Sequence, residues 1–209
     1  MDVILTNVSK KIEKEQVLQD VSFSLKEGMI YGLVGRNGSG KSMLLKTICG
    51  FIRPDKGSVL VDGIDIYKTN SFPKNTRALI ERPNYLPDLT GYENLKMLAS
   101  IMNKIGDEEI FNTLKKVNLF EEKDKKFKKY SLGMKQKLGI AQVLMEDPDF
   151  ILLDETFNGI EDESIEKIRK ILLEEKRRGK LIIIATHIKE DIDELCDVIY
   201  KMSDGKMKE

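Results

Sequence analysis

At positions 35–42 the chain reads Gly35-Arg36-Asn37-Gly38-Ser39-Gly40-Lys41-Ser42, which fits the pattern G-x-x-x-x-G-K-[ST] of a phosphate-binding loop. Residues 29–34, before the loop, form an apolar run that is typical of a buried parallel strand. Residues 43–49, after the loop, have the pattern of a helix. The order of strand, glycine-rich loop and helix is the setting that this motif requires, and it favours phosphate binding over an ordinary glycine-rich turn.

The residue types of the loop suit an anion. The three glycines can adopt backbone angles that are closed to other residues, and they let the backbone come close to a phosphate. Successive N–H groups then point into one concavity, to which the start of the helix adds the positive end of its dipole. Lys41 is expected to reach the β- and γ-phosphates, and the Ser42 hydroxyl is expected to bind Mg²⁺. The predicted nucleotide-binding residues here are Gly35, Arg36, Asn37, Gly38, Ser39, Gly40, Lys41, Ser42 and Met43.

Composition narrows the class of protein. The 209 residues suffice for one sizeable core or two small ones, and 35 basic and 35 acidic residues give a formal net charge of zero. We therefore expect no broad nucleic-acid surface. Residues 1–6 lack the pattern of a signal peptide, and no apolar run is long enough to cross a bilayer, so any membrane role should depend on a partner chain. Cys49 and Cys196 lack metal-ligand spacing and are expected to be buried, reduced thiols in a cytosolic protein.

The rest of the chain alternates between strand and helix patterns. Apolar or alternating runs predict strands at 3–8, 17–25, 58–61, 77–81, 150–154, 181–185 and 198–202, with a polar loop at 10–15. Helical periodicity dominates residues 90–145 and returns at 161–178 and 188–196. We therefore expect an α/β fold in which a mainly parallel-sheet core carries an N-terminal antiparallel β segment and an α-helical insertion.

Two further groups follow buried strands. The apolar strand 150–154 ends in Asp154, with Glu155 next to it. After a phosphate loop, such a pair is expected to hold Mg²⁺ through Asp154 and to polarise the attacking water through Glu155 as general base. His187 follows the strand 181–185 by two residues, at a carboxyl end where ligands gather in open α/β sheets, which predicts contact with the γ-phosphate.

A second candidate anion site precedes the long helix expected at 135–145. Ser131 is a plausible N-cap, and Gly133 would let the backbone approach another group closely. Free N–H groups at a helix start bind anions. Because one phosphate loop already serves the chain's own nucleotide, this second site makes sense if it faces the nucleotide of another molecule. A simply capped helix would explain the same residues.

The order of these motifs resembles the nucleotide-binding subunit of ATP-binding cassette (ABC) transporters. The resemblance covers nearly the whole chain: phosphate loop, helical insertion, Ser131-Leu132-Gly133-Met134-Lys135-Gln136, Asp154-Glu155 and His187. It implies a P-loop NTPase with a RecA-like parallel-sheet core, forming one domain over 1–209. Residues 1–87 and 146–209 would form the ATP-binding core with its β subdomain, and 88–145 the α-helical subdomain. Two such domains pair head to tail in this family, so that Ser131 and Gly133 would touch the γ-phosphate in trans, and 158–161 would form the dimer-contact loop.

The chain departs from the family pattern at several positions. Leu132 and Met134 stand where the family usually has Gly and Gln, and Glu81 stands where it has a glutamine that contacts Mg²⁺. A carboxylate can still ligate Mg²⁺, so Glu81 is a predicted metal ligand with Ser42 and Asp154. Ile12 lies roughly where an aromatic side chain stacks on adenine, and an aliphatic contact would weaken that stacking. Glu81 together with residues 90–95 and 130–134 is similar to exporters linked to bacitracin or lantibiotic resistance and immunity.

The resemblance implies an ATPase that uses ATP and Mg²⁺, with Glu155, His187 and Lys41 as catalytic residues, and that drives a separate membrane permease. We expect a second nucleotide-binding domain as partner, permease contact at 81–95, and a cytoplasmic protein held at the inner face of the membrane by the permease. It would not insert into the membrane directly or bind nucleic acid. Two alternatives stay open: a soluble cassette ATPase without a permease, and a weakly catalytic half of a heterodimeric pair.

Overall fold

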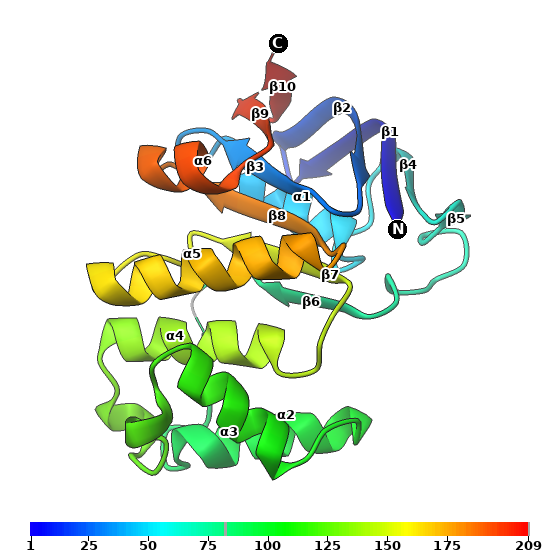
Figure 1. Ribbon diagram of the computed structural model, residues 1–209. Helices are drawn as coiled ribbons and strands as arrows, with labels where there is room; N and C mark the ends of the chain where they lie inside the picture. The colour runs from blue at the N-terminus through cyan, green and yellow to red at the C-terminus, as the bar shows by residue number, and fades with distance from the viewer. Residues whose placement is uncertain (82, 209) are drawn as a thin grey trace.

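The computed structural model describes residues 1–81 and 83–208, and Figure 1 shows how their elements are layered. The central sheet has the strand order β10-β9-β3-β8-β7-β6, with β9, β3, β8, β7 and β6 mutually parallel. A second, antiparallel sheet has the order β2-β1-β4-β5. Helix α1 lies between the two sheets, and α4 and α5 lie on the opposite side of the central sheet (Figure 1). The predicted α/β architecture is confirmed.

The bounds of the elements are as follows. The strands are β1 (Asp2–Ile12), β2 (Glu15–Lys26), β3 (Ile30–Val34), β4 (Lys56–Val61), β5 (Ile64–Asp65), β6 (Thr76–Leu79), β7 (Phe150–Asp154), β8 (Leu181–Thr186), β9 (Val198–Ser203) and β10 (Lys206–Lys208). The helices are α1 (Lys41–Ile48), α2 (Gly91–Met102), α3 (Asp107–Lys116), α4 (Leu132–Leu144), α5 (Asp162–Arg177) and α6 (Lys189–Leu195), with the short 3₁₀ helices η1 (Phe120–Glu122) and η2 (Phe127–Lys129).

The central strands are buried on both faces. Because side chains alternate along a strand, β7 directs Phe150 and Leu152 into one hydrophobic cluster and Ile151 and Leu153 into the other. The first cluster also contains Leu44 of α1 and apolar residues of the antiparallel sheet. This double burial explains why the strands appear in the sequence as nearly continuous apolar runs. It also fixes the carboxyl ends of β3, β7 and β8 at one edge, where the phosphate loop begins.

The prediction of a polar loop at 10–15 is wrong. Strand β1 continues to Ile12 and β2 begins at Glu15, and these two residues face each other across the hairpin. Only residues 13 and 14 form the turn, with Glu13 in the left-handed region at φ 53. The run of Lys and Glu indicates solvent exposure, and the ladder with the neighbouring strand, rather than any apolar pattern, keeps this exposed segment extended.

Other predictions shift by a few residues. The strand expected at 77–81 ends at Leu79, the helix expected at 43–49 begins at Lys41, and the helix expected at 135–145 begins at Leu132. The short strands β5 and β10 carry too little pattern to be predicted from sequence. Cys49 is buried, as expected, whereas Cys196 is only half buried, and both are free thiols. Burial raises the pKa of both thiols, that of Cys49 to about 12.

The helical segment is joined to the core by packing. Leu138 and Ile140 of α4 belong to the same hydrophobic cluster as Ile151 and Leu153 of β7. Gly139 permits this approach, since a Cβ there would lie 2.8 Å from a methyl carbon of Leu79. Across the described ranges, no helix combines the length and apolar character needed to span a bilayer. Helix α4 therefore brings its N-terminal turn close to the carboxyl edge of the sheet.

Candidate active site

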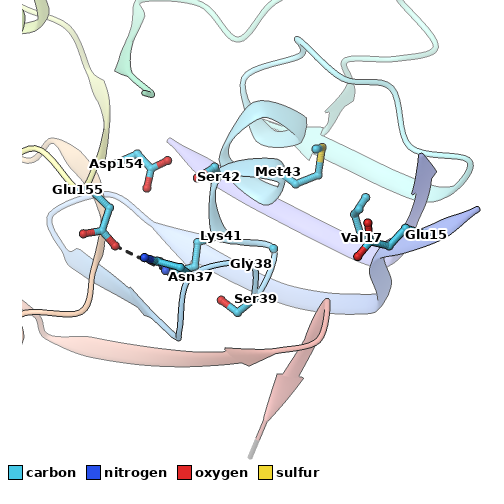
Figure 2. Close-up of a pocket in the computed structure, with 11 residues that line it drawn as sticks. Glu15, Val17, Asn37, Gly38, Ser39, Lys41, Ser42, Met43, Asp154 and Glu155 are labelled. Atoms are coloured by element: carbon cyan, nitrogen blue, oxygen red, sulfur yellow. Dashed lines mark ion pairs between the residues drawn. The ribbon is translucent and has the colours of Figure 1, made fainter. Parts of the chain in front are cut away.

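The phosphate loop borders a cavity of about 460 Å³. Figure 2 shows its lining residues, which come from the loop, from β2 and from the end of β7: Glu15, Val17, Asn37, Gly38, Ser39, Gly40, Lys41, Ser42, Met43, Asp154 and Glu155. Gly38 and Gly40 have φ of 80° and 103°, so the predicted glycine requirement is met at these two positions. Gly40 caps α1 without a side-chain hydrogen bond, which leaves the first N–H groups of the helix available to an anion.

The first glycine of the motif serves a different purpose from the one expected. Gly35 is not among the residues with positive φ. A Cβ at Gly35 would instead lie 2.4 Å from the carbonyl oxygen of Met202 and 2.6 Å from the Ser39 hydroxyl oxygen. The absent side chain therefore allows the loop to pass closely beneath β9. Arg36, the next residue, contributes its carbonyl oxygen, which accepts a hydrogen bond from the Ser39 N–H at 3.1 Å.

The Lys41 ammonium lies inside the concavity of the loop. Its Nζ donates a hydrogen bond to the Gly35 carbonyl oxygen at 2.7 Å and lies 3.6 Å from Oε1 of Glu155, the contact drawn in Figure 2. The side chain is only 5% exposed. A buried cation that faces an open cavity is well placed to bind the negative charge of a triphosphate.

Ser42 and Asp154 form the candidate metal site. Burial raises the pKa of Asp154, while the nearby Ser42 hydroxyl opposes the shift. Oδ1 of Asp154 is buried and has no hydrogen-bond partner among residues 1–81 and 83–208. Within these residues there is no group of three or more His, Cys, Asp or Glu side chains that could hold a metal. A hydroxyl and a single buried carboxylate fit Mg²⁺, which keeps several waters and shares its coordination with phosphates.

Glu155 stands between the phosphate loop and His187. Its backbone lies in the left-handed region, with a φ of 51°, and its N–H donates a hydrogen bond to the Ala185 carbonyl oxygen at 2.9 Å. Its Oε2 lies 2.7 Å from Nδ1 of His187 and accepts a hydrogen bond from the Asn158 amide at 3.3 Å. The expected contact of His187 is with a phosphate, whereas the structure places its imidazole against the carboxylate of the candidate general base. His187 can therefore hold Glu155 in place, and its contact with a phosphate stays a prediction.

A buried ion pair supports the turn that carries His187. Asp191 is fully buried, and its Oδ1 lies 2.6 Å from Nη2 of Arg169 on α5. Its Oδ2 accepts a hydrogen bond from the Thr186 hydroxyl at 3.2 Å, and that hydroxyl oxygen accepts one from the Ile188 N–H at 3.1 Å. Sequence reasoning missed Arg169 and Asp191, because charged residues on a helix usually indicate a solvated face.

Glu81 lies on the other side of the metal site. Its carboxylate pairs with Lys46 of α1, and its φ is 72°. It lines a second cavity, of about 240 Å³, together with Ser42, Leu132, Gln136, Asp154, Glu155 and Asn158. The structure thus brings the three predicted metal ligands, Glu81, Ser42 and Asp154, to one cavity. The role of Glu81 as a ligand stays a prediction, because Lys46, which sequence reasoning missed, already engages its carboxylate.

The remaining predicted residues lie farther out. Ile12 is 40% exposed at the hairpin end and does not line the phosphate-loop cavity, where β2 contributes Glu15 and Val17 instead. Ser131 caps α4 as expected, its Oγ accepting a hydrogen bond from the Met134 N–H at 3.2 Å. Gly133 is buried, and a side chain would not fit there, since a Cβ would lie 2.5 Å from the Gly159 carbonyl oxygen. Ser131 and Gly133 line neither of the two cavities.

The sequence profile of the ABC transporter family matches residues 18–158. The chain belongs to this family. The cassette is 43% identical over 202 residues to the uncharacterized ABC transporter ATP-binding protein YybJ of Bacillus subtilis, covering 97% of this chain and 93% of that protein. It is 36% identical to the bacitracin transport ATP-binding protein BcrA of Enterococcus faecalis, covering 97% of this chain and 67% of BcrA. It is 31% identical to the lantibiotic transport ATP-binding protein SrtF of Streptococcus pyogenes, covering 97% and 87%.

Solved structures agree with this assignment. The ATP-binding subunit of an ABC transporter superimposes on the cassette with a TM-score of 0.89 and 26% identity, covering 100% of this chain and 89% of that one. The predicted P-loop fold and the resemblance to bacitracin and lantibiotic transport subunits are thus confirmed. The chain is an ABC transporter ATP-binding subunit, and members of this family are ATPases.

Proposed function

We propose that this cassette hydrolyses ATP in a Mg²⁺-dependent reaction and thereby drives a separate membrane permease. The relatives BcrA and SrtF are described as bacitracin and lantibiotic transport ATP-binding proteins. The substrate proposed for the permease is therefore an antimicrobial peptide or another small molecule that is exported. The cassette would lie in the cytoplasm at the inner face of the membrane, held there by the permease. Permease contact is proposed for 81–95, of which residue 82 lies outside the described residues.

One observation carries the catalytic part of the proposal. Glu155 is in contact with the phosphate-loop lysine on one side and with His187 on the other. The loop N–H groups and Lys41 would hold the triphosphate, and Glu155 would align the attacking water and accept its proton. His187 would fix the orientation of Glu155. Mg²⁺ bound at Ser42 and Asp154 would neutralise charge on the β- and γ-phosphates, so catalysis rests on positioning and charge stabilisation.

The proposed partner is a second cassette, arranged head to tail. Ser131 and Leu132 are exposed at the start of α4. The hydroxyl of Ser131, whose oxygen serves as the helix cap, can still donate its own proton to a phosphate of the partner's nucleotide. Gly133 packs against Gly159 of the proposed dimer-contact loop, so both trans-acting segments would be presented on one surface.

The test replaces Glu155 with glutamine, which keeps the size of the side chain and removes its basicity. Glu155→Gln should reduce ATP turnover by at least about 100-fold, as expected for loss of a general base. It should still bind Mg-ATP and should accumulate as a dimer on a size-exclusion column. Glu166→Gln, on the exposed side of α5, is a matched control and should behave as wild type. A Glu155→Gln variant that remains monomeric in saturating Mg-ATP would contradict the head-to-tail dimer.

Two departures from the family pattern at the start of α4 favour one alternative. Leu132 and Met134 stand at positions where the family has Gly and Gln, so the cassette could be the weaker half of a heterodimeric pair. Turnover by the purified chain alone supports the homodimer. Absence of turnover, restored when a second cassette is added, supports the heterodimer.

A further inference from the structure

The second cavity joins two parts of the chain that are distant in sequence. Its volume is about 240 Å³, and it lies beside the phosphate-loop cavity, with which it shares Ser42, Asp154 and Glu155. The other wall is made by Leu132 and Gln136 of α4. A side chain from the helical segment therefore faces the candidate metal site of its own chain.

Gln136 is the polar side chain of that wall. It is 5% exposed, and its Oε1 is buried without a hydrogen-bond partner in the part of the chain that the structure describes. An unpaired buried amide oxygen is unfavourable, because it has lost its water without gaining a new donor. The cavity is the space in which a donor for this oxygen can sit.

The other buried oxygens that line the cavity indicate which kind of hydrogen-bond donor would fit there. Oδ1 of Asp154 is likewise buried and has no hydrogen-bond partner within the described residues. The same holds for Oε1 of Glu155, which lies 3.6 Å from the Lys41 ammonium in an ion pair. The Asn158 amide already donates to the other oxygen of Glu155, and Lys46 is engaged by Glu81. The wall therefore offers several unpaired acceptor oxygens to its contents. Such a site suits a cation with its bound waters, and Mg²⁺ in particular keeps its waters.

We propose that Gln136 is a positioning residue whose amide oxygen accepts a hydrogen bond from a water of the hydrated Mg²⁺ held at Ser42 and Asp154. The inference rests on the proposed function, since it concerns the same nucleotide site. It supplies from α4 the neutral amide oxygen that position 81 lacks, because that position carries Glu81 and its carboxylate pairs with Lys46. The start of α4 thus takes part in metal binding within its own chain, besides its proposed contact with the partner's nucleotide.

The experiment measures metal dependence without turnover. Binding of a non-hydrolysable ATP analogue, AMP-PNP, is followed by calorimetry over a series of Mg²⁺ concentrations, which yields the half-saturating Mg²⁺ concentration. Gln136→Met keeps the length of the side chain and removes the acceptor, so this concentration should rise about fivefold, the effect of losing one hydrogen bond. Gln136→Glu supplies a charged acceptor and should lower it, because charge-assisted hydrogen bonds are stronger.

The matched control is Gln142→Met, on the same helix. Gln142 accepts a hydrogen bond from the Tyr85 hydroxyl at 2.5 Å and lies outside both cavities. Its half-saturating Mg²⁺ concentration should equal that of wild type. If Gln136→Met does not fold, as judged by thermal unfolding, the test uses Gln136→Glu alone, because this variant keeps the size and the polarity of the side chain. Its half-saturating Mg²⁺ concentration should then lie below that of wild type.

The outcomes separate the two proposals. Wild-type binding of AMP-PNP that does not depend on Mg²⁺ would overturn the proposed function. Mg²⁺-dependent wild-type binding with both Gln136 variants indistinguishable from Gln142→Met would overturn only the role of Gln136. Opposite shifts in Gln136→Met and Gln136→Glu support it, since a merely structural role would shift both variants in the same direction.

Discussion

Helices α1 and α4 both begin at a site proposed to bind phosphate, and they begin differently. Gly40 caps α1 in the left-handed region, without a side-chain hydrogen bond. Ser131 caps α4 in an extended conformation, and its hydroxyl oxygen accepts a hydrogen bond from the Met134 N–H. The first N–H groups of α1 are thus left to a ligand, whereas one of those of α4 is satisfied by the chain itself.

The surroundings of the two helix starts differ in the same sense. Around the start of α1, a single chain assembles the lysine, the serine and the two carboxylates of the site. Around the start of α4, Ser131 is exposed and lines neither cavity. This difference indicates that the proposed nucleotide site can be complete in one chain, whereas the site proposed at α4 would need a second surface. Binding should therefore survive in the monomer, and hydrolysis should require a dimer.

The largest effect is expected when the buried cation at the start of α1 is removed. Lys41→Ala should abolish nucleotide binding, with a loss of at least about 100-fold, because a charge-assisted contact to the triphosphate disappears. Calorimetric titration with Mg-ATP measures this loss of affinity. Lys135→Ala, near the start of α4, is the control and should bind ATP as wild type in the monomer. Unchanged affinity of Lys41→Ala would break the comparison at its first step.

The second effect tests whether the conformation of the phosphate loop requires glycine. Gly40→Ala should lower the free energy of unfolding by about 3 kcal/mol, since left-handed strain and a close contact add. Its φ is 103°, and the new Cβ would lie 2.8 Å from the Val17 carbonyl oxygen. Gly38→Ala, at φ 80 and facing open space, should cost only about 1 kcal/mol. Urea unfolding compares the two variants, and equal losses would show that the close contact contributes nothing.

The third effect concerns the start of α4. Ser131→Ala should leave ATP binding unchanged and reduce ATP turnover by about 10-fold or more, because the proposed donor to the partner's phosphate is lost. Loss of the cap should also lower stability by about 1 kcal/mol.

Mixing variants tests whether this contact acts between chains. In a head-to-tail dimer of one Ser131→Ala chain and one Lys41→Ala chain, one of the two sites contains both an intact phosphate loop and an intact α4 start. The mixture should therefore regain turnover that each variant alone lacks. No recovery, with dimer formation confirmed by size-exclusion chromatography, would indicate that Ser131 acts within its own chain.

The smallest effect concerns the carboxylate of the metal site. Because burial raises the pKa of Asp154, the folded state binds the proton of this carboxyl more tightly than the unfolded state does. As the pH rises from the unfolded-state pKa through the folded-state pKa, ionisation of Asp154 therefore lowers the free energy of unfolding. Asp154→Asn should therefore raise the midpoint of thermal unfolding at pH 7 without nucleotide. The difference from wild type should vanish as the pH falls below 3.8, the ordinary value of an aspartate. A lower midpoint at pH 7 would contradict this sign.

Much of the fold could be predicted from local pattern. The strands β7 and β8 are buried on both faces and appear as apolar runs, and the phosphate loop is a contiguous motif between a strand and a helix. The hairpin end at 10–15 was missed because its residues are exposed and polar, and cross-strand pairing with β2 rather than composition keeps them extended. Local pattern thus succeeds where burial or backbone geometry constrains neighbouring residues.

The site divides in the same way. The cavity that Lys41, Ser42, Asp154 and Glu155 share could be predicted from sequence alone, because a glycine-rich loop and a strand end place them by local pattern, whereas their catalytic roles stay predictions. The tertiary structure alone decided that Lys46 engages Glu81, that His187 contacts Glu155, and that Gln136 faces the candidate metal site. These contacts join residues 18 or more positions apart in the chain, and only the packing of α4 and the parallel strands around one edge brings their side chains together.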